Sequence, residues 1–240
     1  MPEKRPFGIS AFLRCRNEEE YIVASILSVD RIFDEIVVVL NNSTDRTREL
    51  VEDLMTDHPK IKLLEYAGHC APAGPGYREA VEKDPGRSLA KYYNWCLEQT
   101  TFSHVCKWDG DMIALPPFIE VRTLIESNDV VLIDGYDVLD LPTVNYEPRI
   151  FRYDPSHTRY VDWDLYEVLQ YEYARPTRLE PRCYVHMKLV KREWIHRPWV
   201  SPNDFATTAY PAAGSGSVGA PLSVRLRRIL GSLRRSLWAR

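Results

Sequence analysis

Short apolar runs alternate with segments of helical periodicity through the first 135 residues, and this order constrains the fold more than any other feature. A repeated strand–helix order predicts a mainly parallel, doubly wound α/β sheet with helices on both faces. The predicted strands are residues 8–14, 36–40, 61–66, 104–108 and 130–134. The predicted helices are residues 18–29, 47–57, 88–99 and 117–127.

Polar segments directly follow three of these predicted strands, at residues 14–18, 41–45 and 109–111. Ligands of open α/β sheets bind beyond the carboxyl ends of the strands, so the three segments are expected to converge on one crevice. A Gly/Pro-rich stretch, residues 68–87, is predicted to be irregular and either disordered or a lid over a site.

Two carboxylates, Asp109 and Asp111, flank Gly110 at the end of a predicted buried strand. Mg²⁺ and Mn²⁺ prefer oxygen ligands and often keep substrate phosphates in their shell, so this turn is a candidate metal site. The alternative is an ordinary turn, because Asp and Gly are common turn residues. Under the metal hypothesis, replacing either aspartate abolishes metal-dependent ligand binding and leaves the fold intact.

Three segments in order resemble glycosyltransferase family 2, whose members have the GT-A fold. They are FLRCRNEEEYI at 12–22, DEIVVVLNNSTDRT at 34–47, and SLAKYYNWCL followed by KWDGDM, and together they span roughly residues 7–135. The resemblance implies a nucleotide-diphosphate sugar donor and Mn²⁺ or Mg²⁺ as cofactor. The positions that it places in the donor site are Arg14, Asn17, Glu18, Asn41, Asn42, Asp45, Lys91 and Asp109.

One residue departs from the family pattern, because Leu40 stands where the family usually has an aspartate that contacts the nucleotide. Asn41 or Asn42 is the candidate replacement as a polar contact to the base or ribose. Asp45 has a competing structural role, since an acid before the predicted helix 47–57 can cap that helix.

The segment RIFRYDPSHTRYVDWDLYEVL at 149–169 is similar to a pattern in which R-x-F-R is followed by aromatic residues and a His-Glu pair. Tyr166 and Glu167 occupy the place of that pair, so Glu167 is the first candidate for the general base of an inverting transfer. Asp162 and Asp164 are rivals, and a solvated acidic face is the structural alternative.

Three further residues each have a functional and a structural interpretation. The resemblance implies that His186 is a candidate third ligand to the metal or a contact to the diphosphate, and a histidine beside aromatic residues is alternatively structural. Arg149 and Arg152 can bind the diphosphate or an anionic acceptor. Alternatively, the two arginines pair with Glu147 or Asp154 on the surface.

The last part of the chain differs in charge from the rest. Residues 222–240 contain six arginines and no acid, whereas residues 1–221 contain 25 basic and 34 acidic residues, a net charge of −9. An acidic body argues against a nucleic-acid-binding protein. The tail has the pattern of a basic amphipathic helix suited to an anionic membrane surface or, alternatively, to a partner protein.

The sequence therefore predicts a GT-A domain at 1–210, a linker at 211–221 and an amphipathic tail at 222–240. Residues 7–135 form the donor-binding half of the domain and residues 136–210 the acceptor-binding half, built on the same sheet. The five scattered cysteines are read as free thiols. Without an evident secretory signal or membrane span, the expected place is the cytoplasmic face of a membrane.

The expected activity is an inverting, metal-dependent transfer of a sugar to a glycan or lipid-linked glycan, as in bacterial surface polysaccharide assembly. A sugar-1-phosphate nucleotidyltransferase is the alternative enzyme, but residues 14–18 lack the glycine-rich G-G-x-G-T-R loop of that class. A non-catalytic sugar-binding or scaffolding protein is the alternative outside enzymes.

Overall fold

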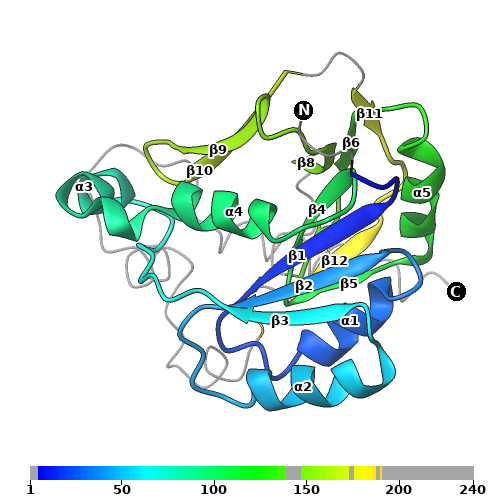
Figure 1. The fold of residues 1–240 in the computed structure, drawn as a ribbon, viewed down its shortest axis with the longest axis horizontal. Coiled ribbons are helices and arrows are strands. Elements are labelled where there is room, and N and C mark those ends of the chain that lie inside the picture. Colours follow the sequence, from blue (N-terminus) through cyan, green and yellow to red (C-terminus); the bar gives the residue numbers. More distant parts are fainter. Residues whose placement is uncertain (1–4, 139–146, 173–175, 188–189, 191–240) are drawn as a thin grey trace, which may run out of the picture.

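The computed structural model describes residues 5–138, 147–172, 176–187 and 190 (Figure 1). A seven-stranded sheet with the order β11-β6-β8-β4-β1-β2-β3 forms its centre. The strands are β1 (Ile9–Cys15), β2 (Glu35–Leu40), β3 (Ile61–Glu65), β4 (His104–Asp109), β6 (Val130–Ile133), β8 (Glu147–Arg152) and β11 (Pro176–Arg178). The first four strands run parallel, and β8 lies antiparallel between β4 and β6.

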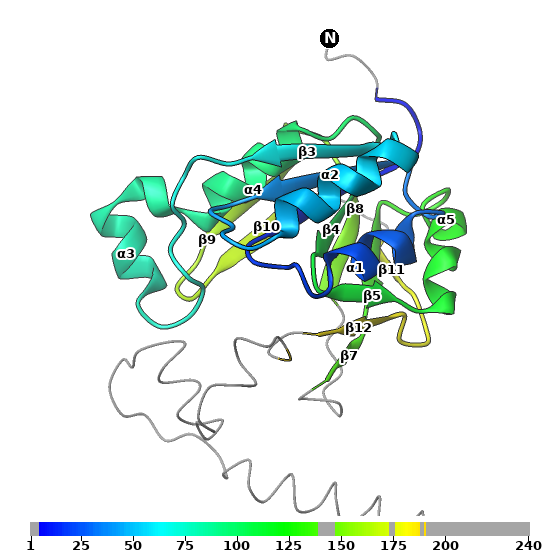
Figure 2. The same cartoon turned by 90° about the horizontal axis from the view of Figure 1, so that it is seen from below.

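Helices cover both faces of this sheet (Figures 1 and 2). One face carries α1 (Ile22–Val29) and α2 (Thr47–Asp57), together with η2 (Pro116–Glu120) and α5 (Val121–Leu124). The other face carries α3 (Tyr77–Lys83) and α4 (Leu89–Glu98). All six residues of β2 are buried, as expected for a strand covered on both faces.

Each face has its own hydrophobic core. The core beneath α1 contains Trp108, whose ring packs against Phe33 and Phe118. The core beneath α4 contains Phe12 and Tyr93, whose rings meet edge to face at 6.1 Å between centroids. Successive residues of a strand point to opposite faces, so β1 and β4 contribute alternately to both cores.

Two smaller sheets complete the described part. The strands β5 (Met112–Ala114), β12 (Tyr184–His186) and β7 (Tyr136–Asp137) form a three-stranded sheet with β12 in the middle. The strands β9 (Thr158–Asp162) and β10 (Glu167–Tyr171) form an antiparallel hairpin. This hairpin is bound to α4, because Asn94 donates to the Tyr160 carbonyl and accepts from the Tyr160 amide.

The predicted doubly wound, mainly parallel sheet is confirmed, and each boundary of the five predicted strands lies within one residue of the observed one. The predicted helix 18–29 begins only at Ile22, because the Glu18 carbonyl closes a turn with the Tyr21 and Ile22 amides. The predicted helix 117–127 is instead the short η2 followed by α5.

The prediction that residues 68–87 are irregular is wrong, since they contain α3 and the short η1 (Pro85–Arg87). Gly76 allows the sharp entry into α3 with a positive φ of 85°, and the buried Tyr77 anchors its first turn. The glycines and prolines of this stretch therefore mark the ends of short helices.

The linker at 211–221 and the tail at 222–240 lie outside the described residues, as does part of the predicted acceptor half. Within the residues that the structure does describe, there is no helix with the length and apolar character needed to cross a membrane.

Candidate functional site

A cluster of charged side chains lies on the α4 face of the sheet. Residue pairing sets Phe12 beside Lys107 and Arg14 beside Asp109, so the pleat directs Arg14, Lys107 and Asp109 to the same face. The antiparallel strand β8 adds Arg149, whose guanidinium reaches the Asp109 carboxylate. Three neighbouring strands thus bring three cations and a carboxylate together near the carboxyl end of β4.

Asp109 is held by two arginines. Its Oδ1 accepts from Arg14 Nη2 at 2.9 Å, and its Oδ2 accepts from Arg149 Nη1 at 2.8 Å. Burial by itself raises the pKa of this carboxyl, but the charges of Arg149, Arg14 and Lys107 outweigh burial and hold its pKa well below the usual range. Asp109 is therefore ionised, and both of its oxygens already have charged partners.

The two arginines have further contacts. The Arg14 guanidinium carbon lies 3.8 Å from the centroid of the Tyr93 ring, a cation–π arrangement. Arg149 also pairs with Glu147 at 2.9 Å. The predicted Arg149–Glu147 pair is present, although Arg149 is buried and the pair is not a surface contact.

Arg152 lies apart from this cluster. It pairs with Asp129 at 3.4 Å, and the Asp154 proposed as its partner pairs instead with His157. The side chain of Arg152 is more than half exposed.

Asp111 and His186 form a second site beside the cluster. The His186 Nε2 lies 3.2 Å from Asp111 Oδ1, and both side chains are largely buried. The pairing of β12 with β5 sets His186 opposite Met112, and the Met187 amide donates to the Asp111 carbonyl. The two residues are 75 positions apart in sequence, and the small sheet is what brings them together.

Gly110 fixes this turn against the loop after β1. A Cβ atom at Gly110 would lie 2.9 Å from both Cys15 Sγ and Glu18 Cγ, closer than such contacts occur. The β4–β5 turn therefore packs against the β1–α1 loop without space for a side chain, and Asp111 is positioned by that packing.

The donor set fits a hard or borderline divalent cation. A carboxylate and an imidazole are acceptable ligands for Mn²⁺, and Mg²⁺ commonly uses one or two carboxylates with substrate phosphates and water. Within the described ranges, no group of three or more His, Cys, Asp or Glu side chains gathers around one point. A cation held by Asp111 and His186 would therefore take its remaining ligands from phosphate oxygens and water. The metal role of Asp109 stays a prediction.

The structure separates the three candidate bases. Glu167, at the start of β10, is buried with its Oε1 3.3 Å from Lys107 Nζ, so it belongs to the charged cluster. Burial and the nearby Arg149 charge lower the pKa of Lys107. Asp162 accepts from Tyr77, from Ser88 Oγ at 2.6 Å and from the Ala90 amide at 3.0 Å, which fixes the start of α4.

The third candidate base, Asp164, is exposed and pairs with Arg78 on α3. Of the three carboxylates, only Glu167 touches the cluster. Its role as general base stays a prediction.

The loops after β1 and β2 converge as expected. Asn17 has a positive φ of 56°, and its Oδ1 accepts from the Thr44 amide at 2.8 Å. The Glu18 amide donates to Thr47 Oγ1, and the Asn41 amide donates to the Cys15 carbonyl. With the Arg14–Asp109 pair, these bonds join all three polar segments at one edge of the sheet.

The remaining predicted donor residues have structural contacts of their own. Asn41 Nδ2 donates to the carbonyls of Tyr66 and Gly68, and Asn42 also has a positive φ of 56°. Asp45 accepts from the Thr47 amide at 3.0 Å and from the Glu19 amide; the N-cap residue of α2 is Arg46, so Asp45 bonds the first helical amide from one position before the cap. Lys91 lies exposed in the first turn of α4.

Leu40 fills the position of the missing aspartate. Its side chain is buried in the core beneath α1. In this chain the end of β2 therefore contributes packing at that position, and the polar groups come from the next residues.

Sequence reasoning missed Lys107 and Tyr93. The segment HVCKWD contains the signal, because residues two apart in a strand share a face and Lys107 lies two before Asp109. Tyr93 could not have been found this way, since its contact with Arg14 depends on how α4 crosses the sheet.

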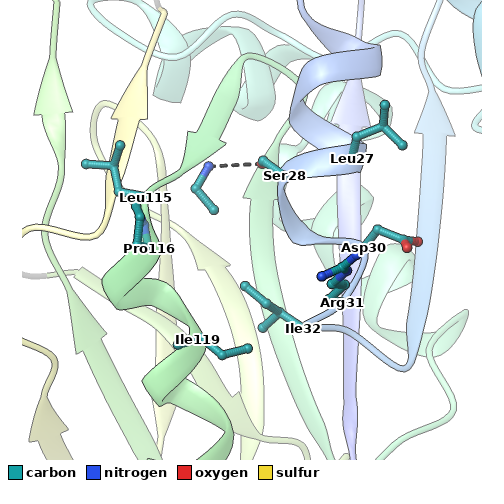
Figure 3. Close-up of a pocket in the computed structure, with 9 residues that line it drawn as sticks. Leu27, Ser28, Asp30, Arg31, Ile32, Leu115, Pro116 and Ile119 are labelled. Atoms are coloured by element: carbon teal, nitrogen blue, oxygen red, sulfur yellow. Dashed lines mark hydrogen bonds between the residues drawn. The ribbon is translucent and has the colours of Figure 1, made fainter.

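A surface pocket lies on the other face of the sheet, between the end of α1 and η2 (Figure 3). Leu27, Ile32 and Ile119 line it, and the Ala114 amide donates to Ser28 Oγ at its side. Its one carboxylate, Asp30, is already paired with His58 and Lys60. The pocket lacks the charged cluster and the Asp111–His186 pair, so we place the candidate site at the sheet edge where the three polar segments meet.

Residues 10–68 match the family model described as glycosyl transferase family 2. No curated protein matches the sequence significantly. Among solved structures, residues 1–349 of TarS from S. aureus are similar, with a TM-score of 0.50 and 18% identity. The match covers 75% of this chain and 60% of that one, so this chain spans less than two thirds of that structure.

Two other solved structures give lower scores. The mannosyltransferase PcManGT from Pyrobaculum calidifontis, in complex with GDP-Man and Mn²⁺, has a TM-score of 0.43 and 18% identity, covering 63% of this chain and 46% of that one. Glucosyl-3-phosphoglycerate synthase from Mycobacterium tuberculosis, in complex with Mg²⁺ and UDP, has a TM-score of 0.38 and 22% identity. That match covers 56% of this chain and 44% of the synthase. The resemblance inferred from the sequence is confirmed as a resemblance: residues 10–68 match the model of glycosyl transferase family 2, and the fold is consistent with the GT-A type.

Proposed function

We propose that this chain is a metal-dependent glycosyltransferase that moves a sugar from a nucleotide-diphosphate donor to a glycan acceptor. The observation that carries the proposal is the convergence of the three family-like segments at one sheet edge, beside the Asp111–His186 pair. Ligand sites of open α/β sheets lie at this edge.

Asp111 and His186 are the residues that would hold Mn²⁺ or Mg²⁺. When bound, such a cation offsets the negative charge of the diphosphate leaving group. Asp109 has a different part in this proposal: it fixes Arg14 and Arg149 so that their positive charge stays at the donor site without rearranging.

Glu167 would take the proton from the acceptor hydroxyl in an inverting transfer. A general base must lie within hydrogen-bond reach of the proton that it takes, and the Lys107 Nζ 3.3 Å away holds the Glu167 carboxylate in the charged cluster. The same contact restricts where the carboxylate can lie, so we give Lys107 a positioning role.

We further propose that the acceptor is a glycan or lipid-linked glycan of bacterial surface polysaccharide assembly, and that the protein acts at the cytoplasmic face of a membrane. The support is the family resemblance and the six arginines of residues 222–240. Each basic residue near an anionic surface contributes about 1 kcal/mol of binding free energy.

Deleting residues 222–240 should abolish salt-sensitive sedimentation with anionic vesicles. Equal sedimentation of the full-length and the truncated protein would favour the alternative of a partner-docking helix.

The test of the activity uses the full-length protein with UDP-, GDP- and dTDP-sugars and Mn²⁺. At least one donor should raise the melting temperature and be hydrolysed slowly without acceptor, because a ligand that binds only the folded state stabilises it. Asp111→Asn should lose both effects. Glu49→Gln, which removes an exposed ion pair on α2, is the matched control and should keep both.

Full hydrolysis by Asp111→Asn, or in the presence of EDTA, would refute the metal assignment. Stabilisation by a donor with no turnover of any donor would favour the non-catalytic sugar-binding alternative. Pyrophosphate-dependent formation of the donor from a sugar phosphate would favour the nucleotidyltransferase.

A further inference from the structure

The turn between β9 and β10 exposes an unusual amount of apolar surface. The five residues 162–166, which we call the hairpin tip, are all exposed and read Asp-Trp-Asp-Leu-Tyr. Trp163, Leu165 and Tyr166 are 61%, 46% and 51% exposed. Single exposed apolar residues are ordinary, whereas three within four positions indicate a binding surface.

The hairpin tip is fixed in place by contacts on both sides. The Trp163 amide donates to the Tyr166 carbonyl at 2.8 Å, which closes the turn. The Gly74 amide donates to the Leu165 carbonyl at 2.6 Å. A turn held by backbone bonds keeps its rings in one arrangement, so binding to those rings costs little conformational entropy.

The acidic side chains of the tip supply a further attachment. Asp162 is bonded to Tyr77 and Ser88, and Asp164 pairs with Arg78 of α3. The tip is therefore attached to α3 and to the start of α4.

The tip also lies at the correct end of the molecule for a substrate. Figure 1 shows the hairpin reaching α3 on the side toward which the arrows of β1 and β2 point. Glu167, the residue after the tip, is the candidate base that contacts Lys107. A molecule bound to the tip would thus contact the residues that directly precede Glu167, the proposed proton acceptor.

We propose that the hairpin tip is a stacking platform for a sugar ring of the acceptor, an inference that rests on the proposed function. A pyranose ring has an apolar face of C–H groups and a rim of hydroxyls. Trp163 and Tyr166 offer flat apolar surface with a polar group at one end, and such side chains suit ligands that are partly apolar and partly wet. The exposed carboxylate of Asp164, which pairs with Arg78, can also accept a hydrogen bond from a hydroxyl.

The charge of the tip favours a sugar over a lipid surface. Exposed Trp, Leu and Tyr residues also occur at membrane interfaces, where basic residues add attraction to anionic lipids. The hairpin tip has two acids and no basic residue. The tip itself therefore lacks the basic residues that attract an anionic membrane, whereas binding of a neutral sugar ring needs none.

The experiment labels the full-length protein with 5-fluorotryptophan and follows the Trp163 signal by fluorine NMR, assigned with Trp163→Phe. The probes are methyl β-D-glucopyranoside, methyl β-D-galactopyranoside and methyl α-D-mannopyranoside. At least one should shift the signal saturably. Tyr166→Ala should weaken that binding tenfold or more. Phe7→Ala, which removes an exposed aromatic ring just before β1, is the matched control and should bind as the wild type does.

No shift with any of the three glycosides would overturn the proposal. A shift with phosphatidylglycerol-containing vesicles and none with glycosides would overturn it in favour of a lipid contact. Donor-induced thermal stabilisation, measured on the same samples, tests the proposed function separately. Glycoside binding without any donor binding would sink the glycosyltransferase proposal and leave the platform in place.

Discussion

Replacing Asp109 with asparagine should destabilise the protein strongly, because the carboxylate neutralises two arginines. Arg14 and Arg149 contact its two oxygens at 2.9 and 2.8 Å, and the side chains are 19% and 6% exposed. Breaking a buried ion pair by removing one partner costs about 3–5 kcal/mol. Glu147 still pairs with Arg149, and Tyr93 still covers Arg14, so the lower half of that range is expected.

This loss is large compared with the roughly 5–15 kcal/mol that stabilises an ordinary domain. One kcal/mol changes the melting temperature of a chain of this size by about 2–4 °C, so a loss of about 3–4 kcal/mol should make Asp109→Asn melt about 6–16 °C lower. The full difference in stability between the wild type and Asp109→Asn should be present at pH 7. The folded pKa of Asp109 is depressed, so its contribution is present above the unfolded value of about 4 and is lost as the pH falls through the folded pKa.

The assay is thermal unfolding without ligand at pH 7, with the double variant Arg14→Met/Asp109→Asn completing a thermodynamic cycle. The two substitutions should be less harmful together than the sum of the single effects, with a coupling of roughly 1–3 kcal/mol. Glu49→Gln, at an exposed ion pair, should melt close to the wild-type temperature. If Asp109→Asn melts within 2 °C of the wild type, the two ion pairs do not hold the site together.

Three further outcomes follow from single residues. Gly110→Ala should lower the free energy of unfolding by about 1–3 kcal/mol and reduce metal affinity, since the new Cβ would displace Cys15 or Glu18. Unfolding and Mn²⁺ titration measure the two effects, and an unchanged affinity would contradict this prediction. Burial and the charge of Arg152 lower the pKa of His104 to about 4. The stability contributed by the neutral His104 ring should therefore be fully present above pH 6.5 and fall by roughly 3 kcal/mol toward pH 4. His104→Gln should remove most of that slope in unfolding measured across this range, and an unchanged slope would count against the assignment. Glu167→Gln should keep donor-induced stabilisation and lose turnover a hundredfold or more, and a comparable loss in an Asp164→Asn variant instead would show that the base is misassigned.

The doubly wound sheet could be predicted because its signals are local. Each strand of the first 135 residues is an apolar run, and each long helix has an apolar face that repeats along the sequence. The helices of residues 77–83 and 85–87 could not be predicted, because their glycines and prolines favour loops. Their anchor is the buried Tyr77, whose hydroxyl contacts Asp162 in a different part of the chain.

The candidate site was predictable as a meeting of loops but not as a set of contacts. The strand ends located Arg14, Asp109 and Asp111, since parallel strands end at one edge. The 3.2 Å contact of His186 with Asp111 depends on a small sheet of three short strands, and short strands have weak sequence signals. Long-range contacts of this kind follow from the packing of the whole chain.

The two aspartates of the D-G-D turn therefore have different surroundings despite their spacing. Asp109 lies on the α4 face between two guanidinium groups, while Asp111 lies beyond the turn against an imidazole. The expectation that either variant leaves the fold intact is revised for Asp109, because its removal leaves the buried Arg149 and the partly buried Arg14 short of a counter-charge. Asp111 is the position at which loss of metal binding should occur at a melting temperature close to that of the wild type. Comparing unfolding with Mn²⁺ affinity in both variants thus assigns a structural role to one carboxylate and a ligand role to the other.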